Sequence, residues 1–230
     1  MENIQTKLID YMNTFFPADK FVYGLLASGE TFLLGGVLRE YKDNDFKNSN
    51  LRDIDFVVDS KTDSLSQILK DYHPTVNRFG GYKINCNGLI IDIWSLNETW
   101  AFKNKLIKCK DTEYRERLQD TVFLNMDSIV YNLTTKKWFD QNYQLAMKTK
   151  ILDTVLKDNP AIPLNILRAI IIKKKYGMLF SDRLNVICKD FINNNINYLE
   201  CFMNIQKDRY DKVIIDKFEI QKELLNEKLD

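Results

Sequence analysis

The stretch between residues 32 and 58 constrains the fold of this chain more than any other. It begins with three apolar residues, turns at Gly35 and Gly36, and continues in a helical pattern that carries Arg39. Glycines let a phosphate approach the backbone, and the start of a helix offers N–H groups and the positive end of the helix dipole. Gly35 and Gly36 are therefore candidate phosphate-binding residues, although a glycine pair before a helix is most often a tight turn. Arg39 either neutralises phosphate or locks the helix to the sheet.

Two carboxylates follow on the next predicted strand, residues 51–58. Alternate residues of a strand share a face, so Asp53 and Asp55 lie on one side and apolar side chains on the other. Their repulsion is relieved by a cation, and Mg²⁺ or Mn²⁺ bound to carboxylates and to substrate phosphate is the usual solution. An isolated Asp-X-Asp is common at solvated strand ends. Its position after the glycine turn and helix favours a site for a metal-bound nucleoside triphosphate.

A third carboxylate, Asp92, interrupts an otherwise apolar strand downstream. Asn87-Gly88 lies between two apolar runs, which predicts a hairpin just before that strand. A buried aspartate needs a partner because an unpaired buried charge is very costly. Beside the other two carboxylates we interpret Asp92 as a third metal ligand, the alternative being an aspartate hydrogen-bonded to a neighbouring loop. Lys83, on the paired strand, is a weaker candidate for binding phosphate.

These motifs resemble the nucleotidyltransferase superfamily with a polymerase-β-like head, and within it the bacterial CCA-adding enzymes and poly(A) polymerases. That group carries Gly-Gly-X-Val-Arg-Asp after a strand, and residues 35–40 are similar, with Glu40 in place of the aspartate. The group's Asp-X-Asp is matched by residues 53–55. Residues 124–131 loosely resemble its Phe-Thr-X-Asn-Ala-X-Ala-Tyr, and residues 163–169 resemble the run that opens its helical neck.

The resemblance implies an α+β fold, with a mixed β-sheet head in residues 1–150 and a helical, neck-like domain in residues 151–230. It implies transfer of a nucleoside monophosphate from an NTP to a hydroxyl acceptor, with release of pyrophosphate and with Mg²⁺ or Mn²⁺ as cofactor. The three aspartates would hold two ions about 3.5–4 Å apart, and Asp92 could accept the proton of the attacking hydroxyl. Arg168, in the neck, is a candidate nucleotide contact.

The chain departs from the family where the family reads the base. The charged residues that select the nucleotide are replaced by Ala161, Ile162 and Asn165. This argues against CCA addition and leaves the acceptor open among RNA, a small molecule and a protein. Arg115 and Arg117 could substitute for other lost nucleotide contacts. The alternative interpretation is a catalytically degenerate module that binds a nucleotide or a protein partner.

Composition is typical of a cytoplasmic globular protein. The 230 residues carry 33 basic and 32 acidic side chains, a weak argument against tight, non-specific binding of nucleic acid. No apolar run approaches the roughly 20 residues that span a membrane, and no signal peptide is visible, so we expect no membrane partner. The four cysteines lack metal-ligand spacing and are expected to be reduced. A single histidine, His73, does not support a histidine-based metal cluster.

The pattern of apolar residues predicts the elements around these motifs. Predicted strands cover residues 31–34, 51–58, 81–86 and 89–96, with a hairpin over residues 127–139. Predicted helices of the first part cover residues 4–15, 62–72 and 98–107. From residue 141 the pattern is helical to the end, including helices at residues 181–194, 196–207 and 210–228. Lys173, Lys174 and Lys175 either form a solvated helix face or contact phosphate.

Overall fold

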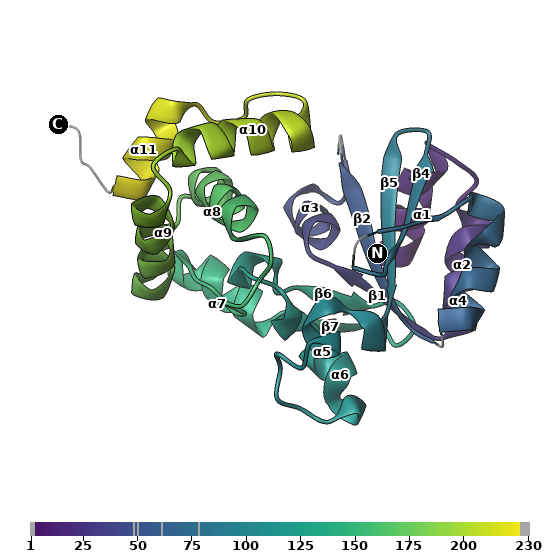
Figure 1. The fold of residues 1–230 in the computed structure, drawn as a ribbon. Helices are drawn as coiled ribbons and strands as arrows, with labels where there is room; N and C mark the ends of the chain where they lie inside the picture. Colours follow the sequence, from purple (N-terminus) through teal and green to yellow (C-terminus); the bar gives the residue numbers. More distant parts are fainter. Residues whose placement is uncertain (1–2, 48, 50, 61, 78, 226–230) are drawn as a thin grey trace. The chain divides into compact units, whose positions relative to one another are not determined.

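The computed structural model describes residues 3–47, 49, 51–60, 62–77 and 79–225 (Figure 1). The chain forms two compact units. The first comprises residues 1–122 and 127–141, and the second comprises residues 123–126 and 142–230. The predicted domain boundary at residue 150 stays a prediction.

Within the described residues of the first unit, seven strands form one mixed sheet in the order β3-β4-β5-β2-β1-β6-β7. Strands β2 and β5 run parallel, and the other neighbours are antiparallel. This mixed sheet, followed by a helical unit, confirms the predicted α+β fold. The strand bounds are β1 (Glu30–Leu34), β2 (Asp53–Asp59), β3 (Thr75–Val76), β4 (Tyr82–Cys86), β5 (Leu89–Ser95), β6 (Val130–Asn132) and β7 (Lys137–Phe139). They are close to those predicted, except that the two-residue strand β3 was not predicted.

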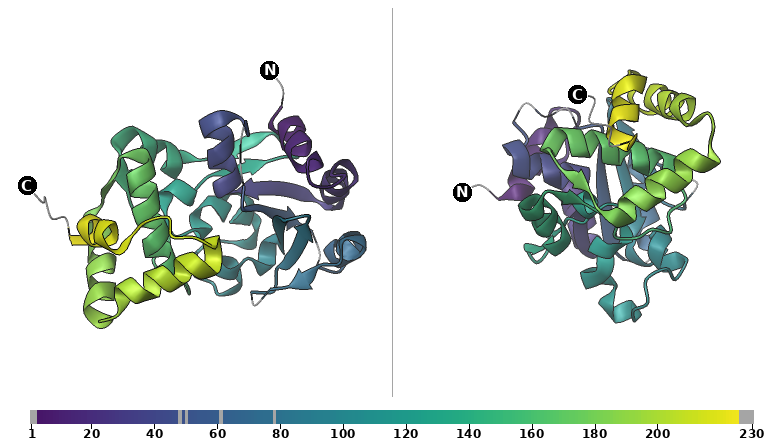
Figure 2. Two further views of the ribbon diagram at one scale, coloured as in Figure 1. Left: turned by 90° about the horizontal axis from the view of Figure 1, so that it is seen from above. Right: turned by 90° about the vertical axis from the view of Figure 1, so that its left-hand side faces the viewer.

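One face of the sheet is apolar along its length. Ile54, Phe56 and Val58 are fully buried on this face, as the alternation along β2 predicts. Figures 1 and 2 show helices packed on this side of the sheet, and the ring of Phe21 on one of them meets that of Phe56 edge-on at 6.0 Å. Their bounds are α1 (Ile4–Asn13), α2 (Asp19–Ser28) and α4 (Thr62–Leu69), of which α2 was not predicted.

The opposite face is divided between an apolar part and an acidic part. The apolar part is a core cluster in which Phe32, Val57 and Val130 pack with Leu96 and Phe102. Short helices complete this side: α5 (Trp100–Lys103) and α6 (Tyr114–Arg117), with single 3₁₀ turns before and after them at η2 (Leu96–Glu98), η3 (Asp111–Glu113) and η4 (Leu118–Thr121). The acidic part carries the aspartates of β2 and β5.

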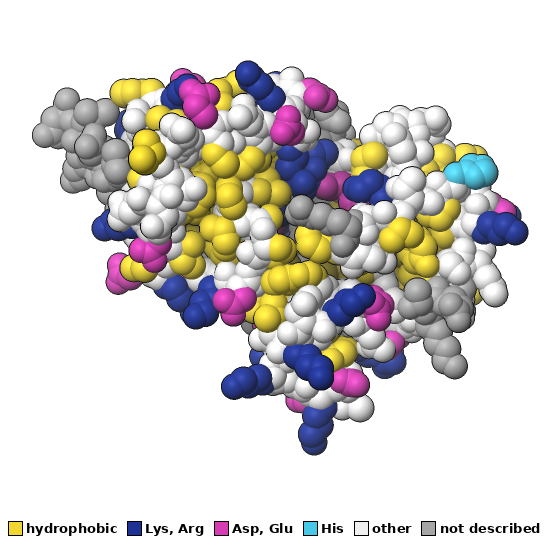
Figure 3. All heavy atoms as spheres, viewed as in Figure 1, with side chains coloured by type: hydrophobic (Ala, Val, Ile, Leu, Met, Phe, Trp, Pro, Cys, Tyr) yellow, Lys and Arg dark blue, Asp and Glu magenta, His cyan; other side chains and the backbone are white. Residues whose placement is uncertain are grey.

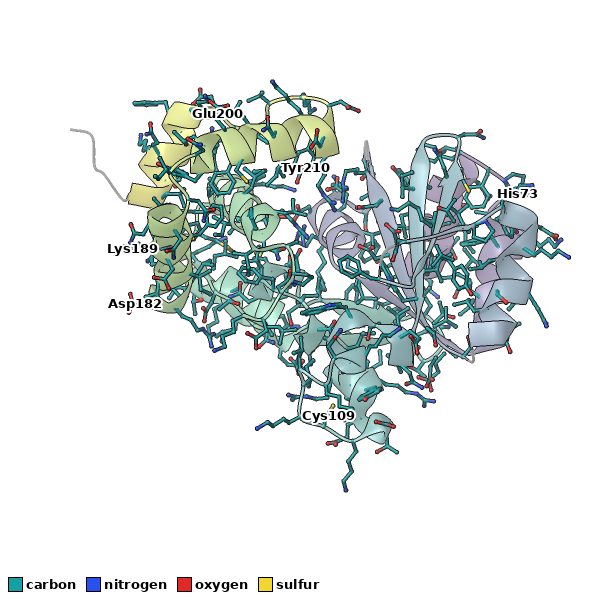
Figure 4. All side chains as sticks on the ribbon, viewed as in Figure 1. His73, Cys109, Asp182, Lys189, Glu200 and Tyr210 are labelled. Carbon is teal, nitrogen blue, oxygen red and sulfur yellow. The ribbon has the colours of Figure 1, made fainter. Side chains whose placement is uncertain are left out.

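The helix predicted over residues 98–107 is wrong in length. Helix α5 ends at Lys103, and Lys105 has a left-handed backbone with φ of 53°. A left-handed residue cannot continue a right-handed helix, so the chain turns there into an extended loop. That loop carries Cys109, labelled in Figure 4.

The second unit is mainly helical. Its helices are α7 (Gln141–Thr149), α8 (Ile162–Tyr176), α9 (Asp182–Asn194), α10 (Tyr198–Tyr210) and α11 (Lys217–Leu225). Figure 4 labels Asp182 and Lys189 on α9 and Glu200 and Tyr210 on α10. A short parallel ladder between β8 (Ile151–Leu152) and β9 (Leu179–Phe180) was not predicted, because two-residue strands are too short to show periodicity.

The last helix begins later than predicted. Asp211 has φ of 53° and ends α10, and α11 starts only at Lys217. Between them the chain is held by the buried side chain of Gln206, which donates to the carbonyl of Ile215 and accepts from the N–H groups of Ile214 and Ile215. A side-chain amide thus replaces the helical hydrogen bonds that the sequence pattern predicted.

Ion pairs join α8 to α11. Lys173 pairs with Glu223 and Lys174 with Glu219. These two lysines therefore pair within the helical unit, and Lys174 and Lys175 are exposed as a solvated helix face would be; contact with phosphate stays a prediction. No described helix of either unit is long and apolar enough to cross a membrane.

Candidate nucleotide and metal site

The strand register brings the three predicted carboxylates to one face of the sheet. Asp55 lies directly opposite Asp92 in the parallel pair of β2 and β5, and Asp53 precedes Asp55 by two residues. Neighbouring strands lie about 4.8 Å apart, so Asp55 and Asp92 are adjacent across the sheet. We call Asp53, Asp55 and Asp92 the carboxylate row. Both residues of β2 are half-exposed, whereas Asp92 is buried.

Lys83 is the direct cross-strand neighbour of Asp92 on the other side. The two residues oppose each other in the antiparallel pair of β4 and β5, and Lys83 Nζ lies 2.8 Å from Asp92 Oδ2. The lysine side chain is 43% exposed and that of the aspartate 10%. The second oxygen, Asp92 Oδ1, is buried and has no hydrogen-bond partner among the described residues. Asp92 is thus a charged, buried group that is only half satisfied.

Basic side chains engage two members of the carboxylate row. Arg52 pairs with Asp53, as Lys83 does with Asp92. Across the residues that the structure describes, no three Asp, Glu, His or Cys side chains converge as a ready metal cluster. The donor set nevertheless fits a hard cation, because it consists of carboxylate oxygens and includes the unsatisfied Asp92 Oδ1. Holding an ion requires these carboxylates to turn away from their basic partners.

The glycine turn lies beside the carboxylate row. Leu34, the last residue of β1, is opposite Asp55, so the turn at Gly35 begins one residue beyond that pair. Gly35 has φ of 66°, which favours glycine, and its N–H donates to the carbonyl of Ile129 at 3.0 Å. A Cβ built on it would meet no atom within 4 Å. Helix α3 (Gly36–Asn44) starts immediately after, so a helix N-terminus adjoins open space.

Arg39, on α3, contacts Asp127 in the turn η5 (Asn125–Asp127) that precedes β6. Both side chains are largely buried, at 14% and 7% exposure. This contact corresponds to the second predicted role, in which Arg39 locks its helix to the sheet. Sequence reasoning missed Asp127, which occupies the asparagine position of the run resembling Phe-Thr-X-Asn. A buried arginine requires a hydrogen-bond acceptor. The asparagine position of that run was the feature of the sequence that could have identified Asp127 as this acceptor.

Glu40, which departs from the family pattern, works within its own segment. Its carboxylate accepts hydrogen bonds from Asn44 Nδ2 at 2.6 Å and Ser49 Oγ at 3.0 Å. It therefore ties the end of α3 to the segment that leads into β2. This role is structural and keeps the two halves of the motif in place.

A second group of carboxylates lies at the Asp59 end of β2 and is paired with an arginine. Glu30 and Asp59 are cross-strand neighbours, and Arg115 contacts both, at 3.0 Å and 2.5 Å. The hydrogen bond to Asp59 raises the pKa of Arg115 further. Arg117 in turn pairs with Asp120. Both arginines offered as nucleotide contacts thus already hold carboxylates of the first unit.

The residues predicted to face the base lie in the second unit. Asn165, near the start of α8, is buried and donates its amide to Asn159 Oδ1 at 2.6 Å, while its N–H bonds the carbonyl of Ala161. Its side chain therefore fastens the start of α8. Arg168 is half-buried on the same helix, and its contact with a nucleotide stays a prediction.

Trp94 and His73 both lie outside the carboxylate row. Trp94 packs against the core cluster and over Gly81, where a Cβ would lie 2.1 Å from its indole nitrogen. It is therefore a packing residue. His73 is exposed at the end of η1 (Lys70–Tyr72), the cyan side chain in Figure 3. It belongs to no part of the carboxylate row.

The fold is that of the nucleotidyltransferases predicted from the motifs. Similar solved structures include a CCA-adding enzyme in complex with CTP (TM-score 0.62, 12% identity, 98% of this chain and 54% of that chain). Others are the Thermotoga maritima CCA-adding enzyme in complex with tRNA (0.60, 13%, 98% and 54%) and a tRNA-processing enzyme in an apo form (0.54, 15%, 89% and 55%).

The chain spans just over half the length of these three proteins. No protein-family model matches it, and a comparison of its sequence with curated proteins found no match. The likeness is one of structure at low identity, and it confirms the predicted resemblance at the level of the fold.

Proposed function

We propose that the first unit is a nucleotidyltransferase that moves a nucleoside monophosphate from an NTP to a hydroxyl acceptor and releases pyrophosphate. One observation carries this proposal. Asp55 and Asp92 are adjacent across β2 and β5, Asp53 shares their face, and the turn at Gly35 begins one residue beyond the same register position. Carboxylates for a cation and a helix N-terminus for phosphate therefore lie side by side.

Each residue has a defined part in this proposal. Asp53 and Asp55 would hold Mg²⁺ or Mn²⁺, which when bound neutralises charge on the triphosphate and stabilises the displacement. Asp92 would accept the proton of the attacking hydroxyl, because its Oδ1 is buried beside Asp55 and is unsatisfied within the described structure. Gly35 and Gly36 would let the triphosphate approach the backbone at the start of α3.

Arg39 has a positioning part. Its guanidinium holds Asp127 and so fixes α3 against the segment before β6. Contact with phosphate is therefore assigned to the backbone of the glycine turn, because the ammonium group of Lys83, the weaker candidate, is itself paired with Asp92.

Selection among nucleotides is expected to be weak. The positions that would read the base in the resembling enzymes are Ala161 and Ile162, which lack side-chain hydrogen-bonding groups, and Asn165, whose amide bonds Asn159. A site with few polar groups discriminates poorly, because no buried donor or acceptor is left unpaired by the wrong base. Similar structures contain CTP, ATP and tRNA. RNA is thus one proposed acceptor, without ordered addition of C, C and A.

A second candidate function is nucleotide binding without transfer. It is favoured by the pairs Lys83–Asp92 and Arg52–Asp53, which already neutralise two carboxylates of the row. Both functions would use the same surface, but only the first would release pyrophosphate.

The test measures pyrophosphate release from each of the four NTPs with Mg²⁺, using RNA with a free 3′ hydroxyl and small hydroxyl compounds as acceptors. We expect turnover with the wild type and its loss in Asp55→Asn. Asp59→Asn is the matched control, because Asp59 lies on the same face of the same strand but is held by Arg115. Nucleotide binding without pyrophosphate would support the second function. Equal turnover by wild type and Asp55→Asn would contradict the assigned site.

A further inference from the structure

The basic side chains that pair with the carboxylate row are themselves well exposed. Arg52 pairs with Asp53 and Lys83 with Asp92, and the two basic side chains are 40% and 43% exposed. Arg52 lies just before β2, and Lys83 lies on β4. Both residues have long side chains that keep their charged ends near water. Either charged group can therefore leave its carboxylate for solvent without being buried.

Other basic side chains of the first unit are held more firmly on their carboxylates. Arg39, which holds Asp127, is only 14% exposed. Lys42 lies 2.9 Å from a carboxylate oxygen of Asp140, and its ammonium group is also 4.2 Å from the centre of the Trp138 ring. Packing thus fixes these two pairs, whereas the partners of the carboxylate row are exchangeable.

Arg52 and Lys83 compete with any cation for the carboxylate row. Three carboxylates and two basic groups leave these five side chains with one net negative charge instead of three. A divalent ion that binds Asp53 displaces the guanidinium of Arg52, and one that takes both oxygens of Asp92 displaces the ammonium of Lys83. Each displacement breaks a favourable charge interaction, so the net affinity for the ion falls.

We propose that Arg52 and Lys83 are the resident counter-charges of the carboxylate row, which a divalent ion displaces when it binds. The two residues thereby set the affinity of the site for the ion, and a free ion binds more weakly than it would to the carboxylates alone. This inference rests on the proposed function for the identity of the site, but not for turnover. It treats Asp53 and Asp92 alike, since each has a basic partner.

The test measures the Kd of the full chain for Mn²⁺ without nucleotide, by calorimetric titration and by the electron paramagnetic resonance of free Mn²⁺. We expect Lys83→Met to bind Mn²⁺ about tenfold more tightly than the wild type, because the ion no longer displaces a charge-assisted hydrogen bond. Arg52→Met should tighten binding by a smaller factor, because Asp53 is more exposed than Asp92 and water weakens its pair. Arg52→Lys and Lys83→Arg keep the charge and should bind as the wild type does.

Lys42→Met is the matched control for loss of a lysine that holds a buried carboxylate. Asp140, its partner, is 5% exposed and follows β7, the edge strand beyond β6, so the control leaves the carboxylate row intact. Both methionine variants should melt at lower temperature without metal, but only Lys83→Met should bind Mn²⁺ more tightly. Lys83→Gln can still donate a hydrogen bond to Asp92 without a charge, so it serves if Lys83→Met fails to fold.

A second control places the effect at the carboxylate row. Asp55 is adjacent to Asp92 across the sheet and two residues from Asp53, so an ion bound at the row depends on it. In an Asp55→Asn background, neither Arg52→Met nor Lys83→Met should tighten the binding of Mn²⁺.

Unchanged or weaker binding of Mn²⁺ in Arg52→Met, Lys83→Met and Lys83→Gln would overturn the inference. An equal gain in Lys42→Met, or no binding of Mn²⁺ by any variant, would overturn it as well. Its failure is distinguishable from failure of the proposed function. Tighter binding in the variants, without pyrophosphate release by the wild type, would refute the transferase and leave the inference standing. Pyrophosphate release with unchanged affinities would do the reverse.

Discussion

The two ends of β2 both carry carboxylates on the same face, and they differ in how those carboxylates are satisfied. At the Asp59 end, Arg115 contacts Asp59 and Glu30 together, and Asn132 donates a further bond to Glu30. At the other end, Asp92 beside Asp55 has a buried oxygen that accepts no hydrogen bond from any described group. Acidic residues at a strand end thus indicate little by themselves. The satisfaction of their oxygens separates a structural pair from a candidate binding site.

Two further carboxylates are held by arginines, as Asp59 and Glu30 are. Asp127 is held by Arg39. In the second unit, Asp153 accepts bonds from Arg183 and Ser181 and from the N–H of Thr154. Carboxylates that are paired in this way should contribute to stability, and replacing them should leave the stabilisation by Mg²⁺ unchanged. Replacing residues of the carboxylate row should reduce the stabilisation by Mg²⁺.

The largest expected effect on stability is at Arg39. Arg39→Met leaves the carboxylate of Asp127 buried without its counter-charge, so we expect a loss of about 3–5 kcal/mol in the free energy of unfolding. Urea denaturation followed by circular dichroism measures it. The double variant Arg39→Met, Asp127→Leu should lose less, because no charge is then left buried. Exposed ion pairs contribute less than about 1 kcal/mol. A loss of that size for the single variant would contradict the prediction and show that this contact contributes no more than a surface ion pair.

The comparison is sharpened by the response to Mg²⁺. An ion that binds only the folded protein stabilises it by about 2.7 kcal/mol at 100 times its Kd. We expect Asp55→Asn to lose most of that gain and Asp59→Asn to keep it, as measured by melting temperature with and without Mg²⁺. Equal responses of the two variants would remove the distinction between the two ends of β2.

Removal of Arg115 should have a smaller effect. Arg115 is half-exposed, so its two ion pairs are screened by water, and Arg115→Met should cost about 1 kcal/mol as Glu30 and Asp59 come to oppose each other. Chemical denaturation checks this value. Arg115→Lys should recover part of the loss. An altered Mg²⁺ response in Arg115→Met would show that the two ends are coupled.

The smallest effect concerns the acid stability provided by Asp153. Burial alone raises the pKa of Asp153, but hydrogen bonds from Arg183, Ser181 and the N–H of Thr154 outweigh it, so the net pKa is lowered. Its stabilising contribution is therefore complete above the unfolded pKa of about 3.9 and is lost as pH falls through the folded value. Asp153→Asn should be less stable than the wild type at neutral pH, with the gap narrowing below about pH 4. Unfolding curves at several pH values measure the gap, and a constant gap would contradict this assignment.

The sequence allowed prediction of those features that depend on short-range geometry. Alternation along β2 placed Asp53 and Asp55 together on the face opposite Ile54. The Asn87-Gly88 turn fixed the pairing of the next two strands, and with it the place of Asp92. Strand alternation and tight turns of this kind are set by the local backbone. They can therefore be predicted from the sequence without knowledge of the rest of the fold.

Partners distant in sequence were not predictable in the same way. Arg39 meets Asp127 across 88 positions, and Arg115 reaches Glu30 across 85. Periodicity shows which face a side chain occupies, but not which segment covers that face. The late start of α11 has a similar cause, because Gln206 holds the preceding segment through its side chain.

The hairpin turn at Asn87 and Gly88 has a consequence for how insertions would act. Exposed turns usually tolerate extra residues, because few contacts depend on them. Here one added residue could shift β4 by one position against β5, and every β4 side chain would then face the opposite side of the sheet. Lys83 would leave Asp92 and enter the apolar layer beneath α1 and α2. A change at the surface, with no site residue altered, would thus dismantle the charge arrangement of the site.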